Sequence, residues 1–321
     1  MGCSRTNGLP GTTRYTTMKT RFPIWQLVGP RAKIMLVFAA CLSLVGVAPT
    51  RSTAAENQLY APANLVAWCI VPFDAQKRGP EERALMLDRL GIKRLAYDWR
   101  AEHVPTFDQE VETMQRHGIE ITAWWFPGGL NDTARKILEC LERHRVKTQL
   151  WISMGDPAPQ AAQPEKVQAA AAAIRPIAQA AAKIGCSVAL YNHGGWFGEP
   201  ENQVAIVEQL QLPNVGIVYN FHHGHGHIAR FPELWRKMQP HLLAINLNGM
   251  VLNGDKTGKK ILTLGEGDQE LAMLQTIRDS GWRGPVGILD HRPETDSEKT
   301  LQANLAGLQR LRQKLSAAPK K

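Results

Sequence analysis

The chain has 321 residues, of which 44% are hydrophobic, and a formal net charge of +9. This hydrophobic share excludes a largely disordered protein and is enough for one large core or two small ones. Seven Lys and Arg residues precede Glu56, the first acidic residue. The chain from Glu56 onward holds 31 Lys and Arg and 29 Asp and Glu, so its formal net charge is only +2. A nucleic-acid partner is therefore not expected.

Residues 1–55 are predicted to be a leader with a secretory signal. Basic residues precede the apolar run "IMLVFAACLSLVGVA" (residues 34–48), and small residues follow in "STAAEN", where we expect cleavage after Ala54 or Ala55. The alternative is a membrane anchor, but the run is shorter than the ~20 residues of a spanning helix. We therefore expect an exported protein, periplasmic or secreted, with no stable membrane anchor after cleavage.

From residue 60 to 314, short apolar runs alternate with stretches of helical period. The eight apolar runs read as strands: 65–73, 92–99, 119–126, 146–154, 186–193, 214–221, 242–249 and 284–291. The helical stretches follow them: 80–91, 107–118, 131–145, 164–185, 201–210, 231–239, 268–281 and 296–315. This rhythm predicts an α/β fold, a single-domain (β/α)8 TIM barrel with parallel strands; an open doubly wound sheet is the alternative. Residues 315–321 are expected to fray.

Active sites of such barrels lie at the C-terminal ends of the strands, which makes polar and aromatic side chains there the candidates. As substrate-binding residues this predicts Asp98, Arg100, Trp124, Trp125, Asn192, Asn220, Asn246, Asn248 and Arg292. As catalytic residues it predicts His193, His223 and Asp290. Other interpretations stay open: Asp98 and Arg100 as a salt bridge, one of the two tryptophans as core, and Asn246 and Asn248 as loop caps.

The stretch "NFHHGHGHIARF" (residues 220–231) holds four histidines after the sixth predicted strand. Regular alternation would place His223, His225 and His227 on one side and His222 on the other, although the intervening glycines are expected to break the strand. Neutral imidazoles bind zinc, iron or manganese. A metal site formed by His193, His223, His225 and Asp290 is one hypothesis, and a histidine-rich structural loop is the other.

Two further kinds of site are not indicated. "GEGD" (residues 265–268) lacks the strand–turn–helix spacing of a phosphate-binding loop, so no nucleotide cofactor is expected. Cys69, Cys140 and Cys186 are widely spaced, with no CxxC pair. Buried free thiols are the favoured interpretation, and one disulfide is the alternative.

Five segments resemble the xylose isomerase-like barrels, the sugar isomerase and epimerase family. They are "ALYNHGGW" (189–196), "NFHH" (220–223), "INLNG" (245–249), "TLGEGD" (263–268) and "IRDSGWRGPVGIL" (277–289). The likeness spans about residues 62–312. Members of that family bind one divalent metal, and the resemblance places its ligands at Tyr191, Asn220, Asn246, and Leu289 or Asp290.

Of the family's metal-site motif, only His223 persists. Tyr191 and Asn220 replace carboxylates that hard cations prefer. The resemblance therefore implies either a metal-free site or a relocated Mn, Zn, Mg or Fe ion on the histidine and Asp290 set given above.

The resemblance also implies an activity, which is proton transfer next to a carbonyl of a sugar or keto-sugar derivative. Isomerisation or epimerisation is favoured, and lyase or hydratase chemistry on an oxidised sugar uses the same first step. A catalytically inactive carbohydrate-binding barrel is the alternative from another class. The abasic-site endonuclease branch of the family is disfavoured by the near-neutral charge and the export signal.

Overall fold

The computed structural model describes residues 58–318, and the predicted leader and its cleavage site lie outside this range. Eight parallel strands close into one barrel in chain order, and β1 pairs with β8 through Leu65 and Val286. The strands are β1 (Leu65–Trp68), β2 (Arg94–Tyr97), β3 (Glu120–Phe126), β4 (Gln149–Ile152), β5 (Ser187–Tyr191), β6 (Val215–Asn220), β7 (Leu242–Leu247) and β8 (Val286–Leu289). The predicted (β/α)8 barrel is confirmed, and the open sheet is excluded.

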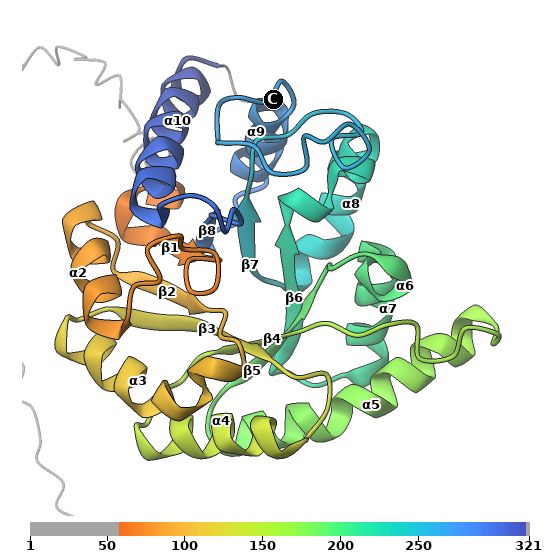
Figure 1. Ribbon diagram of the computed structural model, residues 1–321. Coiled ribbons are helices and arrows are strands. Elements are labelled where there is room, and N and C mark those ends of the chain that lie inside the picture. Colours follow the sequence, from red (N-terminus) through yellow and green to blue (C-terminus); the bar gives the residue numbers. More distant parts are fainter. Residues whose placement is uncertain (1–57, 319–321) are drawn as a thin grey trace, which may run out of the picture. The chain divides into compact units, whose positions relative to one another are not determined.

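Helices connect the strands and lie around the barrel (Figure 1). The longer ones are α2 (Pro80–Leu90), α3 (Phe107–Arg116), α4 (Asp132–Arg143), α5 (Gln163–Lys183), α7 (Pro200–Leu210), α8 (Phe231–Met238), α9 (Glu270–Asp279) and α10 (Ser297–Ala317). α6 (Gly195–Gly198) is a single turn, and the 3-10 helices are η1 (Pro62–Asn64), η2 (Ala101–Thr106), η3 (Phe221–His223), η4 (His225–Arg230) and η5 (Gln239–His241). α10 continues to Ala317, beyond the boundary predicted at residue 314.

The barrel interior combines large indole rings with small residues. Trp68 and Trp151 meet edge to face, with ring centroids 4.8 Å apart. They belong to one buried cluster with Ala96, Ala123 and Ala189. Small side chains on neighbouring strands leave the width that two indoles need, so the centre of the barrel is a packed core and not a channel.

Strand alternation separates the two tryptophans of β3. Trp124 belongs to the core between the strands and the helices, where it packs edge to face against Tyr97 and Phe107. Trp125 packs against the interior cluster instead. One of the two is therefore core and the other faces the barrel interior, as the period of two predicts.

The three cysteines of the described region, Cys69, Cys140 and Cys186, are free and buried, as favoured from the sequence. Between residues 58 and 318, no helix has both the length and the apolar character needed to cross a bilayer.

Candidate functional site

A cavity lies at the C-terminal ends of the strands. Aromatic, histidine and charged side chains line it: Trp68, Cys69, Phe73, Asp98, Arg100, Trp125, Tyr191, His193, His222, His223 and His291. Its free volume of about 50 Å³ holds a few water molecules. A whole sugar ring does not fit into this space, so only the reacting part of a ligand would enter without movement of the rim.

Four imidazoles contribute to the lining of this cavity. The ring of His223 lies 3.7 Å from that of His222 and 4.6 Å from that of His193, between centroids. His291 is 5.3 Å from His222. Burial, with a smaller contribution from neighbouring positive groups that include Lys260, lowers the pKa of His223 to about 2 and that of His291 to about 4. The imidazoles are therefore neutral at physiological pH, with lone pairs that can accept protons or hydrogen bonds.

Asn220, at the end of β6, links two of the lining residues. Its Oδ1 accepts from the backbone N–H of His222 at 3.2 Å and from Nδ1 of the same ring at 2.8 Å. Since the partner is an acceptor, Nδ1 carries the ring hydrogen and Nε2 holds the lone pair. The Asn220 Nδ2 donates to the Tyr191 oxygen, which also accepts from Trp68 Nε1 at 3.3 Å. With two donors at its oxygen, Tyr191 is left to donate its own hydrogen to a ligand.

Asp98 supplies the carboxyl group of the cavity. Its Oδ1 accepts from the Val71 N–H at 3.3 Å, whereas its Oδ2 is buried without a partner among residues 58–318. Burial raises the pKa of Asp98 to about 7, although the nearby Arg100 opposes this shift. A carboxyl with this pKa can take or give a proton at neutral pH.

Arg100 does not form the salt bridge considered for it. Its Nη1 donates to the backbone carbonyls of Asp98 and Trp99, both at 2.8 Å, rather than to the Asp98 carboxylate. The guanidinium lies over the Phe73 ring, 5.3 Å from its centroid. Arg100 therefore lines the cavity as a positioned cation, beside a carboxyl that has no ion-pair partner there.

Three predicted ligand-binding residues have structural contacts and do not line this cavity. Trp124 lies outside the barrel interior, as described above. Asn192 is fully buried and holds the backbone of Asn220, donating to its oxygen at 3.0 Å and accepting from its nitrogen at 2.7 Å. Asn248 ties down the following loop through the Lys260 oxygen and the Leu262 N–H, which confirms the loop-cap alternative for this residue.

Three others lie near the strand ends but do not line the cavity. Asp290 accepts from Ser297 Oγ at 2.8 Å, and burial raises its pKa to about 6. Arg292 donates to Thr263 Oγ1 at 3.3 Å. Asn246 is fully buried, and neither of its amide atoms has a partner among the described residues. A role for Asp290 as a catalytic residue therefore has no support from its position.

The remaining histidines of "NFHHGHGHIARF" serve other parts of the fold. β6 ends at Asn220, so His222 and His223 occupy a 3-10 turn and both reach the cavity, contrary to the prediction of opposite sides. The ring nitrogens of His225 lie 2.9 Å from the carbonyl oxygens of Val251 and Lys260. Nδ1 of His227 lies 3.1 Å from the Tyr219 hydroxyl oxygen, and Nε2 of the same ring lies 3.4 Å from the Glu199 carboxylate.

The family's metal does not fit the residues present here. Tyr191 already accepts two hydrogen bonds, Asn220 Oδ1 is taken by His222, and Leu289 has no donor atom. The relocated set is not assembled either, because His225 binds backbone carbonyls and Asp290 bonds to Ser297.

Asp108, Cys140 and His144 bring three potential metal-ligand atoms within 4.8 Å of one another. Among residues 58–318 this is the one such group of Cys, His, Asp or Glu side chains, and none of its members lines the cavity. Arg143 pairs with Asp108 at 2.6 Å there, and burial raises the pKa of the Cys140 thiol to about 12. Both effects disfavour a cation at that group.

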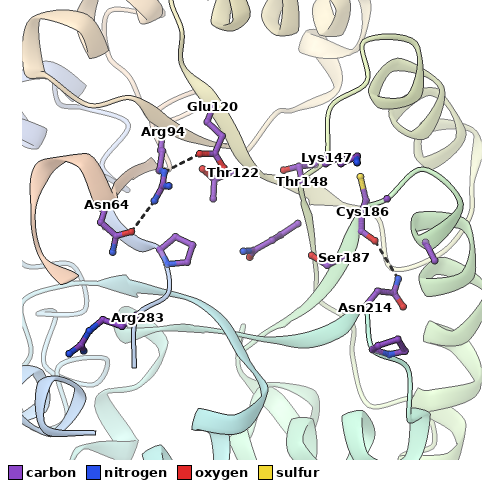
Figure 2. A pocket seen from close by; sticks show the side chains of 15 residues that line it. Asn64, Arg94, Glu120, Thr122, Lys147, Thr148, Cys186, Ser187, Asn214 and Arg283 are labelled. Carbon is purple, nitrogen blue, oxygen red and sulfur yellow. Dashed lines mark hydrogen bonds and ion pairs between the residues drawn. The ribbon is translucent and has the colours of Figure 1, made fainter. Parts of the chain in front are cut away.

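A larger cavity, of about 640 Å³, lies at the opposite end of the barrel (Figure 2). Residues at the starts of strands line it, among them Arg94, Glu120 and Ser187, and an Arg94–Glu120 ion pair of 3.0 Å crosses its edge. Residues at this end of a (β/α)8 barrel serve stability, so its size does not make it the catalytic site.

Comparison with known proteins decides the family. The profile described as "Xylose isomerase-like TIM barrel" matches residues 93–311. The chain belongs to this family. No curated protein sequence matches it significantly.

Solved structures of xylose isomerase-like barrels and related enzymes share the fold. A 3-keto-D-glucoside 4-epimerase from E. coli, YcjR, is 15% identical with a TM-score of 0.56, covering 78% of this chain and 99% of that one. The probable 3-DHS dehydratase AsbF from Bacillus anthracis is 16% identical with a TM-score of 0.60, covering 77% and 98%. The IOLI protein, solved with a bound zinc atom, is 17% identical with a TM-score of 0.59, covering 78% and 99%.

Several lining residues were not among the predicted site residues. Phe73 and Cys69 follow β1, where no polar side chain marks the strand end. Tyr191 was assessed only as a poor metal ligand. His222 and His291 follow the sixth and eighth predicted strands, and this position marks them as strand-end candidates although no specific role is predicted for them.

Proposed function

We propose that this xylose isomerase-like chain is an exported enzyme that moves a proton at the carbon next to a carbonyl of a sugar or keto-sugar. Isomerisation or epimerisation is the favoured outcome. The observation that carries the proposal is the meeting of the Asp98 carboxyl, the Tyr191 hydroxyl and neutral imidazoles in one cavity at the C-terminal strand ends.

In this mechanism Asp98 is the base. Its unpartnered Oδ2 takes the proton from the carbon, the C–H electron pair forms a carbon–carbon double bond, and the carbonyl oxygen gains the negative charge. The Tyr191 hydroxyl donates a hydrogen bond to that oxygen, held in place by Trp68 and Asn220. The Asp98 carboxylic acid then returns its proton to the adjacent carbon, while a neutral imidazole of His193 or His223 carries the hydroxyl proton of the enediolate from one oxygen to the other, which gives the isomer.

Dehydration starts with the same proton transfer. If a hydroxyl group on the next carbon leaves with the proton that Asp98 has taken up, the product is an unsaturated sugar and water, and the Asp98 carboxylate is restored. The neutral imidazoles of His193 and His223 can accept hydrogen bonds from the other hydroxyl groups of the sugar.

Deuterium exchange tests the proposal. The purified protein is incubated in D2O with a panel of sugars and keto-sugars, and solvent deuterium in the recovered sugar is measured by mass spectrometry. We expect exchange that falls at least about a hundredfold in Asp98→Asn, since general-base catalysis contributes 10²–10⁴-fold. Because the base acts in its ionised form, the rate should rise through pH about 7, the pKa of Asp98.

The matched control is Asp132→Asn, which makes the same chemical change at an exposed carboxylate of α4 that does not line the cavity. Binding of a sugar without exchange would contradict the enzyme and support a carbohydrate-binding barrel. Binding of DNA would instead favour the endonuclease branch. Export is tested separately by sequencing the N-terminus of the secreted or periplasmic product, which should begin at residue 55 or 56.

A further inference from the structure

Arg100 lines the histidine cavity, and the positive charge of Lys260 acts on the imidazoles of that cavity. Burial is the main cause of the lowered pKa of His193, and the charge of Lys260 is the second. The same charge also lowers the pKa values of His222, His223 and His291. The only acidic side chain that lines the cavity is Asp98, which is buried and has a raised pKa. The exposed Lys260 and the half-buried Arg100 are therefore positive, whereas the one carboxyl group of the cavity is buried.

The loop that carries Lys260 is fixed at this position. The Lys260 carbonyl oxygen lies 2.9 Å from both Asn248 Nδ2 and His225 Nε2. The side chain itself is exposed, and no ion pair engages it among residues 58–318. The backbone that carries this exposed ammonium group is therefore held in place by His225 and Asn248.

Arg100 supplies a second cation with a defined orientation. Two backbone carbonyls hold its Nη1, and the Phe73 ring supports its face. Its Nη2 and Nε have no hydrogen-bond partner within the described residues, and the side chain is only partly buried. A guanidinium held in this way presents its remaining N–H groups to a planar or tetrahedral anion.

We propose that the sugar bound at this site carries an anionic group, a carboxylate or a phosphate, which Arg100 and Lys260 hold at the rim. The inference rests on the proposed function and names its substrate class. The small free volume agrees with it, because the anionic end stays at the rim while the carbonyl end reaches Asp98 and Tyr191.

Binding measurements on the purified protein test the inference. Isothermal titration compares glucose with glucuronate and glucose 6-phosphate, and fructose with fructose 6-phosphate, at low and at high salt. We expect at least one anionic sugar to bind about tenfold or more tightly than its neutral partner, since one charge-assisted hydrogen bond contributes this much. The advantage should shrink at high salt. The carboxylate and phosphate probes distinguish the two sources of charge.

Lys260→Gln and Arg100→Gln should each remove most of this advantage. Lys147→Gln is the matched control, because Lys147 is an exposed lysine that lines the cavity at the other end of the barrel. Equal binding of every neutral and anionic pair, or an equal loss in Lys147→Gln, would overturn the inference. Lys260→Gln keeps the test decisive if Arg100→Gln fails to fold.

The outcomes separate the inference from the proposed function. Tight binding of an anionic sugar without deuterium exchange would sustain the inference and reject the enzyme. Deuterium exchange into a neutral sugar at a rate that Lys260→Gln leaves unchanged would support the enzyme and reject the anionic substrate.

Discussion

Asn192 and Asn246 are two fully buried asparagines at the ends of β5 and β7, and they should respond very differently to alanine substitution. Asn192 makes two hydrogen bonds to the backbone of Asn220, at 2.7 and 3.0 Å. Asn246 makes none among the described residues. Because losing a buried hydrogen bond and leaving its partner unsatisfied costs about 1–3 kcal/mol, Asn192→Ala should lower the free energy of unfolding by about 2–4 kcal/mol.

Asn246→Ala should change the same free energy by less than about 1 kcal/mol, because no hydrogen bond is lost and an unpaired polar group is removed. Urea denaturation at 25 °C measures both values, with equal m-values as the check on two-state unfolding. Equal losses in the two variants would refute the reasoning, since volume and burial would then matter and hydrogen bonding would not.

Three further changes test other parts of the structure. Glu110→Ala should cost about 3–5 kcal/mol in urea denaturation, because it leaves Arg83, its buried partner at 2.5 Å, without an ion pair; a loss below about 1 kcal/mol would contradict this. His225→Ala should speed hydrogen exchange in residues 249–262 while the barrel strands stay protected, and uniform exchange throughout would argue against a local clamp. The pKa of Asp98 is raised from 3.8 to about 7, so the folded protein keeps a proton that the unfolded chain has lost between these pH values. The free energy of unfolding should therefore fall as pH rises from about 4 to about 7. Asp98→Asn should abolish this part of the pH dependence of the urea midpoint.

The fold was predictable because the barrel depends on local patterns. Each strand is a short apolar run followed by a helical period, and the alternation along β3 separates Trp124 from Trp125 without knowledge of any contact. Eight such units allow few other arrangements. The predicted strand ends therefore located the mouth of the barrel.

The site was less predictable because its side chains are positioned by contacts distant in sequence. Asn192 ends a strand as a ligand-binding residue would, but the backbone of Asn220 engages both of its amide atoms. His222 and His223 share one cavity because a 3-10 turn follows β6, and strand alternation does not extend into such a turn. His225 binds two carbonyls of a loop more than 20 residues away.

The tryptophans beneath the cavity give the protein an internal optical reporter. Trp68 donates its indole N–H to Tyr191, and its ring lies 4.8 Å from Trp151 and 6.2 Å from Trp125. A molecule that hydrogen-bonds to Tyr191 changes the surroundings of these coupled indoles directly. Its arrival is therefore expected to alter the intrinsic fluorescence, so occupancy of the mouth can be followed without a label and before any reaction has been identified.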